Sequence, residues 1–80
     1  MLLQTEGIMI EYTKFWILLE ASGESTYTLI HKYRVSSSTI HKLRHNKPLT
    51  TTTLNDLCRI LKCNIGDICD YVPIVSDQAL

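Results

Sequence analysis

The chain has 80 residues and a formal net charge of zero at pH 7, so it forms one domain without a strongly basic overall composition. Hydrophobic residues make up 45% of it, but no run approaches the roughly 18 apolar residues that a membrane-spanning helix requires. Its three cysteines, an odd number, fit a reducing compartment better than a framework of disulfide bonds. We therefore expect a cytoplasmic protein that is not membrane-bound.

The first predicted helix covers residues 14–22. Thr13 suits the N-cap position, and Gly23 suits the left-handed residue that ends a helix. Apolar or small residues follow the i, i+3, i+4, i+7 spacing of a buried helix face, namely Phe15, Leu18, Leu19 and Ser22. Trp16 and Ile17 lie beside this stripe and widen it, so they either complete the core or meet a partner.

Two further helices are predicted on either side of a short turn. The second begins after Ser25 and ends near Tyr33, and the third begins after Ser36 and ends near His45. The residues expected to face the core are Leu29, Ile30 and Tyr33 on the second helix and Ile40 and Leu43 on the third.

A fourth helix is predicted after Thr50 and a fifth after Asn64, closed by Pro73. Their inward residues are Leu54, Leu57, Cys58 and Leu61, then Ile65, Ile68, Cys69 and Val72. Hydrophobic staples, which pair the residue before a cap with the fourth helical residue, support three of these starts. The pairs are Val35 with Ile40, Leu49 with Leu54, and Cys63 with Ile68. The sequence therefore predicts an all-α domain of five helices.

The charges are unevenly distributed along the chain. Between Glu24 and Asp56 there is no acidic residue. That interval holds five strong bases and all the histidines, namely Lys32, Arg34, Lys42, Arg44, Lys47, His31, His41 and His45. A central segment of one sign indicates a surface for phosphate groups, although a solvated basic face would give the same pattern.

The segment from Ser25 to Pro48 resembles the helix-turn-helix of the phage Cro and C1 repressor family, in its short bacterial and phage forms. The shared pattern is a cap, a helix, a turn, Val35-Ser36 and a second helix that ends in Asn46-Lys47-Pro48. The resemblance implies a lambda-repressor-like fold over residues 12–73. Residues 1–11 are then a poorly ordered extension, and residues 74–80 are a C-terminal tail.

The resemblance also implies a function and a set of site residues. It predicts a sequence-specific transcriptional regulator that binds double-stranded DNA, with a recognition helix at about residues 37–45 in the major groove. The implied base-reading residues are Ser37, Ser38 and Lys42. The implied contacts to the DNA backbone are Thr26, Arg44, His45 and Lys47.

Several positions have a second interpretation. Ser37 and Ser38 suit helix capping as well as base contact, and Lys42 suits a solvated surface. The family usually has glycine in the turn where this chain has Arg34, which contacts phosphate or points to water. A left-handed arginine there would cost on the order of 1 kcal/mol. The alternative function for the whole chain is a protein-interaction module on the same fold, with DNA contact weak or lost.

No enzymatic activity, cofactor, metal or small-molecule ligand is predicted. The central segment has no carboxylate to orient a histidine and no glycine-rich elbow to present a serine. The cysteines, Cys58, Cys63 and Cys69, lack the two-residue spacing of zinc ligands, so we interpret them as small core residues rather than a metal sensor.

A homodimer through the C-terminal region is the expected assembly, because one recognition helix reads only a few base pairs. Val72, Ile74 and Val75 are the apolar residues proposed for this contact. The alternative is that these side chains pack back on their own domain.

Overall fold

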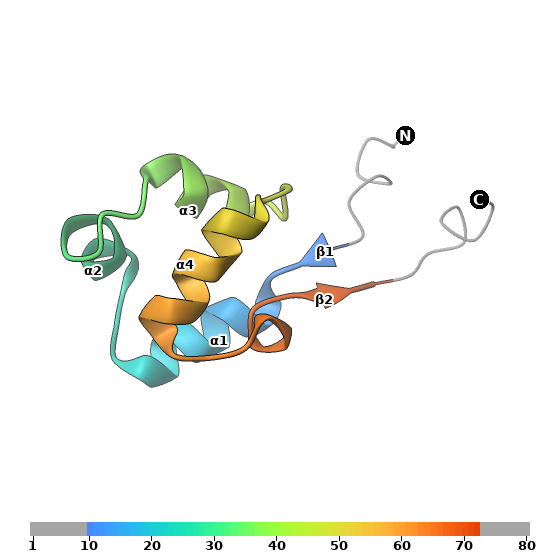
Figure 1. Ribbon diagram of the computed structural model, residues 1–80, viewed down its shortest axis with the longest axis horizontal. Helices are drawn as coiled ribbons and strands as arrows, with labels where there is room; N and C mark the ends of the chain where they lie inside the picture. Colours follow the sequence, from blue (N-terminus) through green and yellow to red (C-terminus); the bar gives the residue numbers. More distant parts are fainter. Residues whose placement is uncertain (1–9, 73–80) are drawn as a thin grey trace.

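Four α-helices, a short 3₁₀ helix and a two-stranded sheet make up residues 10–72, which are the residues that the computed structural model describes (Figure 1). In chain order they are β1 (Ile10–Glu11), α1 (Thr13–Ser22), α2 (Thr26–His31), α3 (Ser37–Arg44), α4 (Thr51–Leu61), η2 (Ile65–Asp67) and β2 (Asp70–Tyr71). None of these helices is long and apolar enough to cross a membrane.

Helix α1 begins one residue earlier than predicted and has a different cap. Thr13 is its first helical residue, and Tyr12 occupies the N-cap position without a side-chain capping bond. The Thr13 hydroxyl instead donates a 2.6 Å hydrogen bond to Oε1 of Glu11. Gly23 ends the helix as predicted, with φ of 84°, a left-handed conformation that costs glycine little because it has no Cβ.

The helix pair α2 and α3 begins at the predicted caps. The Ser25 side chain accepts the Thr28 N–H at 3.2 Å, while the Thr28 hydroxyl accepts the Ser25 N–H at 2.8 Å. Helix α2 ends at His31, two residues before the predicted end near Tyr33. Arg34 then adopts φ of 64°, the left-handed turn residue, and the Ser36 side chain caps α3 by accepting the Thr39 N–H at 3.1 Å.

Helix α4 also begins at its predicted cap, because the Thr50 hydroxyl accepts the Thr53 N–H at 3.1 Å. The predicted fifth helix is wrong. After Asn64 the chain makes only the short η2 turn, and β2 then pairs antiparallel with β1, with Ile10 opposite Tyr71.

The expected fifth helix was predicted to begin after Asn64, and η2 begins at that position. The Asn64 N–H donates to Asp67 Oδ2 at 3.0 Å there. Continuation of η2 into a longer helix is disfavoured for two reasons. The residue before a proline avoids the helical region, so Pro73 limits a helix that begins after Asn64 to about two turns, which is too short to be stable by itself. The backbone groups of Asp70 and Tyr71 bond instead to the strand that precedes α1. As a result Ile65 and Val72, predicted to face the core, are 52% and 39% exposed.

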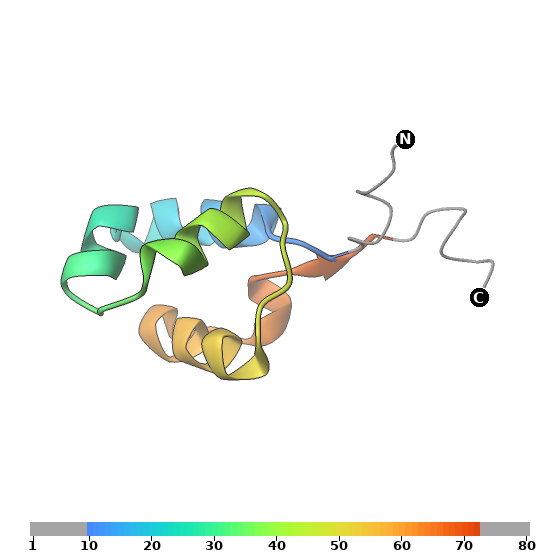
Figure 2. The ribbon, with the colours of Figure 1, turned by 90° about the horizontal axis from the view of Figure 1, so that it is seen from above.

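The core lies between α1, α4 and the pair of helices α2 and α3. Ile68, the residue that follows η2, closes it. The buried residues of the core are Tyr12, Phe15, Leu19, Leu29, Ile40, Leu43, Leu57, Leu61 and Ile68. Viewed from above, the α2–α3 turn lies at one end of the described domain and the two-stranded sheet at the other (Figure 2). The sheet therefore lies away from the turn of the helix-turn-helix.

Candidate nucleic-acid interface

Helix α3 has one buried side and one exposed side. Ile40 is 6% exposed and Leu43 is 1% exposed, and both belong to the core. The side chains of Ser37, Ser38 and Lys42 are exposed. The structure thus brings the three predicted base-reading residues together on the outward side of one helix, since residues four apart lie one above the other.

The two serines at the start of α3 are free of the capping role. Ser36 is the N-cap, and its hydroxyl bonds to both the Thr39 N–H and the Thr39 hydroxyl, at 3.1 and 3.0 Å. Ser37 and Ser38 follow it in the first turn, and among the described residues neither hydroxyl is hydrogen-bonded within the protein. Their donors and acceptors are therefore available to an external partner.

The C-terminal end of α3 carries the basic residues. Arg44 is the last helical residue, His45 is the C-cap and Lys47 follows two positions later, all with exposed side chains. The rings of His41 and His45 lie one helical turn apart, with their centroids at 4.3 Å. The residues predicted to contact the DNA backbone, other than Thr26, are thus grouped at the C-terminal end of α3.

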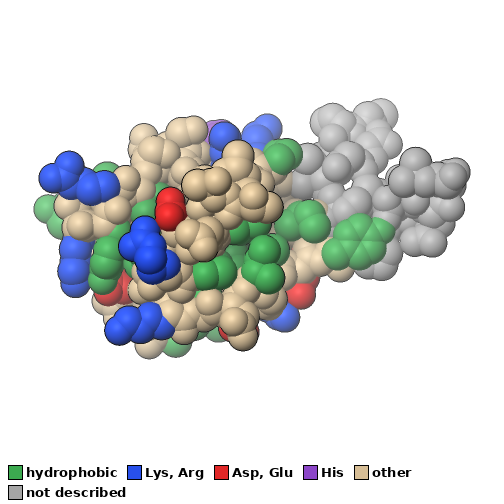
Figure 3. Space-filling model, in the orientation of Figure 1, with side chains coloured by type: hydrophobic (Ala, Val, Ile, Leu, Met, Phe, Trp, Pro, Cys, Tyr) green, Lys and Arg blue, Asp and Glu red, His purple; other side chains and the backbone are tan. Residues whose placement is uncertain are grey.

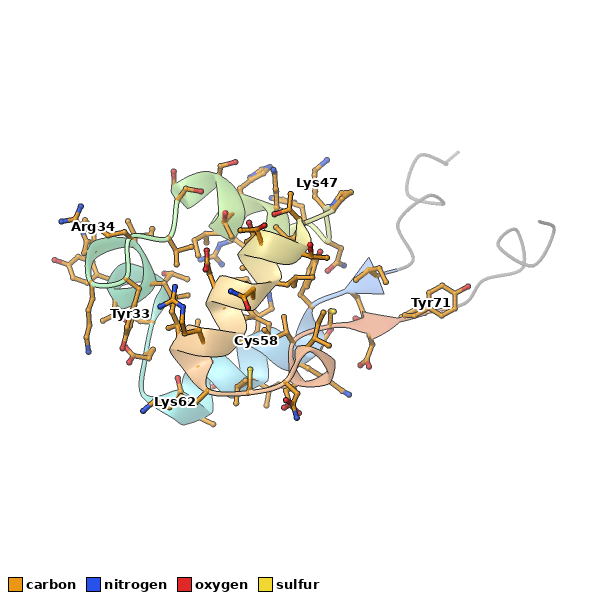
Figure 4. The ribbon with its side chains drawn as sticks, viewed as in Figure 1. Tyr33, Arg34, Lys47, Cys58, Lys62 and Tyr71 are labelled. Atoms are coloured by element: carbon orange, nitrogen blue, oxygen red, sulfur yellow. The ribbon has the colours of Figure 1, made fainter. Side chains whose placement is uncertain are left out.

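Thr26 lies apart from that group. It is the first residue of α2, half-buried and directly after the Ser25 cap. Figure 4 places Arg34 at the far end of the helix pair from Lys47, and both side chains point away from the core. The exposed bases therefore flank α3 at both ends.

The segment after α3 is fixed to the start of α1. Asn46 adopts a left-handed conformation with φ of 53°, and its Oδ1 accepts the N–H of Tyr12 at 3.2 Å. The hydroxyl of Tyr12 donates to the carbonyl oxygen of Lys47 at 2.7 Å. Burial raises the pKa of this phenol, and Cys69 adds a smaller contribution in the same direction, so Tyr12 stays a neutral donor.

Acidic groups near the helix pair are few and already engaged. The Tyr33 hydroxyl donates to Glu24 Oε2 at 3.0 Å. Hydrogen bonds from Thr28 and Tyr33 lower the pKa of Glu24, so its carboxylate stays charged. By contrast, the face dominated by α4 mixes basic, acidic and hydrophobic side chains (Figure 3), including the ion pair between Asp56 and Arg59 at 3.2 Å. Within residues 10–72, Lys42 and Arg44 on α3 and Arg34 and Lys47 on either side of it are exposed bases in a segment of the chain without acidic residues.

The cysteines lie around α4 and η2. Cys58, Cys63 and Cys69 are free thiols, half-buried and packed against the core. Burial, together with the neighbouring Cys58, raises the pKa of Cys63 to about 11. In the part of the chain that the structure describes, no three histidine, cysteine or acidic side chains are placed to hold a metal ion.

The sequence profile of the Cro/C1-type HTH DNA-binding domain matches residues 14–73. This chain belongs to that family. The predicted family membership is thus confirmed, and α2 and α3 are the helix-turn-helix of a Cro/C1-type domain.

Among solved structures, the Cro/C1-type domain is similar to the crystal structure of the transcriptional regulator VanUg, form II. The two chains are 33% identical with a TM-score of 0.74, and the match covers 82% of this chain and 88% of the other. No curated protein sequence matches this chain.

Sequence reasoning missed two contacts of this Cro/C1-type domain. The Arg44 guanidinium carbon lies 4.9 Å from the centre of the Trp16 ring, and Tyr12 contacts Asn46 and Lys47. In both contacts the partner of Tyr12 or Trp16 lies about 30 positions later in the sequence, so no local pattern indicates the contact. Trp16 and Ile17 were both predicted either to complete the core or to meet a partner. Trp16 is partly buried and packs against the core, whereas Ile17 is 64% exposed.

Proposed function

We propose that this domain is a sequence-specific, double-stranded DNA-binding transcriptional regulator that places α3 in the major groove. The observation that carries the proposal is the two-sided character of α3, which buries Ile40 and Leu43 and exposes Ser37, Ser38 and Lys42. A recognition helix needs this arrangement, because one side must hold it on the domain while the other meets base edges. We expect a binding protein rather than an enzyme, located with the DNA in the cytoplasm.

The base contacts come from the N-terminal two turns of α3. The Lys42 ammonium can donate to O6 and N7 of guanine, which makes it the principal base reader. Ser37 and Ser38 can donate to or accept from any base, so their contribution to specificity is broad. Discrimination therefore depends mainly on Lys42 and on the shape of the DNA.

The contacts to the DNA backbone come from Thr26, Arg44, His45 and Lys47. Three of these side chains lie at the C-terminal end of α3 or just after it, while Thr26 begins α2. This distribution suits a helix that enters the groove between two stretches of phosphate backbone. Phosphate contacts fix the register of the protein and carry little sequence information.

Two copies acting as a homodimer complete the proposal. A single α3 spans too few base pairs to select one site in a genome. Within the described residues, exposed hydrophobic side chains gather at the sheet, where Ile10 is 40% exposed, Tyr71 54% and Val72 39%. Figure 4 shows Tyr71 projecting from β2 away from the helices. Ile74 and Val75, the other residues predicted for this contact, lie outside the described residues.

The test is selection of duplexes from a randomised pool, followed by affinity measurements at several salt concentrations. The proposed function predicts that one sequence is enriched. It also predicts that the logarithm of the binding constant falls linearly with the logarithm of the salt concentration. A protein-interaction module would enrich no sequence and would bind duplexes weakly at every salt concentration. That result would overturn the proposal in favour of the alternative function.

A further inference from the structure

The indole of Trp16 connects the core to the DNA-facing helix. Its ring meets that of Phe15 edge to face, with centroids 4.9 Å apart and planes at 80°, and Phe15 is fully buried. The guanidinium carbon of Arg44 lies 4.9 Å from the centre of the same indole. Trp16 therefore contacts a fully buried residue of the core and, at the same time, the last residue of α3.

Arg44 has no competing partner of opposite charge in the described part of the chain. The ion pairs of residues 10–72 join Lys14 to Asp70 and Arg59 to Asp56, and neither includes Arg44. A guanidinium over an aromatic ring is attracted through its flat face, which leaves the N–H groups at its edge free to donate. Those groups match the geometry of a phosphate.

An arginine held in this way has lost part of its side-chain freedom before DNA arrives. A flexible arginine would lose the same freedom on binding, at a cost to the affinity. The ring under Arg44 thus removes part of the cost of forming a phosphate contact. Because the indole is itself packed on Phe15, the position of Arg44 is set by the core of the domain.

We propose that Trp16 is a positioning residue of the DNA interface, which holds Arg44 at the end of α3 with its N–H groups available to a phosphate of the DNA backbone. This inference rests on the proposed DNA-binding function. It assigns Trp16 a role that acts through Arg44 and requires no contact between the indole and DNA.

The chain has one tryptophan, so its fluorescence reports on this contact directly. In the free protein, Arg44→Ala should shift the emission to longer wavelengths, because it uncovers the ring to water. Lys42→Ala removes a cation from the same helix without touching Trp16, and it should leave the emission unchanged. In the unmodified chain, titration with a selected duplex should change the emission with the same midpoint as the anisotropy of labelled DNA.

Affinity for that duplex then separates positioning from packing. Trp16→Leu keeps an apolar side chain but removes the aromatic face, and it should weaken binding by about three- to fivefold. Trp16→Phe restores a face for the cation and should weaken binding by less than about twofold. In the Arg44→Ala background, Trp16→Leu should cost less than about twofold, because the residue through which it acts is gone. Thermal unfolding of each variant establishes that it is folded at the assay temperature.

Two results would overturn the inference. An equal loss from Trp16→Leu with and without Arg44 would show that the indole acts independently of the arginine. Unchanged emission in Arg44→Ala would show that the two side chains are not in contact in solution, and this measurement needs no Trp16 variant to fold. Failure of the unmodified chain to bind any selected duplex would instead overturn the proposed function itself, while the emission of the free protein still reports the contact.

Discussion

The hydroxyl of Tyr12 donates a 2.7 Å hydrogen bond to the carbonyl oxygen of Lys47, which lies 35 positions later in the chain. The N–H of the same tyrosine donates to Oδ1 of Asn46 at 3.2 Å. Tyr12 is 2% exposed, whereas Asn46 and Lys47 are exposed. The residue before α1 therefore holds the segment that leaves α3, and it sets the position of Lys47, a proposed contact to the DNA backbone.

Tyr12→Phe should lower the free energy of unfolding by about 1 kcal/mol, because it removes one hydrogen bond in a partly buried position and keeps the packing of the ring. Urea denaturation followed by circular dichroism measures this change. Tyr27→Phe is the matched control, since Tyr27 is 69% exposed, and it should stay within about 0.5 kcal/mol of the unmodified chain. Equal midpoints for the two variants would contradict a structural role for the Tyr12 hydroxyl.

Lys42→Ala and Lys47→Ala should have different effects on DNA binding. Loss of the proposed base contact of Lys42 should cost about 1–3 kcal/mol on the selected duplex and relax discrimination at one base pair. Loss of Lys47 should weaken binding to all duplexes alike and reduce the salt slope by about one unit. Titrations on selected and random duplexes measure both effects. Identical behaviour of the two variants would show that the assignment of base and phosphate contacts is wrong.

Arg34→Gly should stabilise the domain by roughly 1 kcal/mol, because φ of 64° is a left-handed conformation that costs residues with a Cβ about that much. Gly23→Ala is the complementary change and should destabilise the domain by a similar amount, because φ is 84° there. No neighbouring atom obstructs the added methyl group, so the cost comes from the backbone conformation alone. Denaturant midpoints of the two variants should therefore move in opposite directions. A destabilising Arg34→Gly would mean that the arginine side chain makes contacts that outweigh the backbone strain.

The stability of the domain should fall as the pH rises from about 9 to about 11. Burial and the nearby Cys58 raise the pKa of Cys63 from 9.0 to about 11, so the folded state holds this thiol proton more tightly than the unfolded state. The resulting stabilisation is complete below the unfolded pKa and is lost as the pH rises through the folded value. Denaturant unfolding at several pH values in this window measures the decline.

Cys63→Ala provides the control for that dependence, because it removes the thiol and should make the decline shallower. The remaining slope belongs to Tyr12 and Cys69, whose pKa values are also raised by burial, and to Lys32, whose pKa is raised chiefly by Tyr33. A variant that declines as steeply as the unmodified chain would show that Cys63 titrates normally in the folded state.

Removing residues 74–80 should dissociate the proposed homodimer. Ile74 and Val75 are lost in this variant, and we expect a lower sedimentation coefficient together with weaker binding to a palindromic site. Binding to a single half-site should stay within about twofold, because α3 and its supporting core are untouched. A shortened chain that sediments like the full chain and binds the palindrome equally well would exclude dimerisation through the C-terminal region.

The starts of α2, α3 and α4 could be predicted from the sequence alone. Ser25, Ser36 and Thr50 were predicted as caps, and each accepts the N–H of the residue three positions later. These bonds are local, so the order of side chains along the chain is enough to specify them. The same reasoning placed Ser37, Ser38 and Lys42 opposite the buried stripe of α3, because the helical period alone decides which residues share a side.

The strand pairing that ends the described domain and the contact between Arg44 and Trp16 depend on the tertiary structure. The segment after Asn64 has the spacing of an amphipathic helix, yet Asp70 and Tyr71 pair with Glu11 and Ile10 from the other end of the chain. The contact of Arg44 with Trp16 likewise joins residues from two different helices. Hydrogen bonds and ring contacts between distant segments depend on how the helices pack in space. The spacing of residue types along the sequence therefore does not predict these contacts.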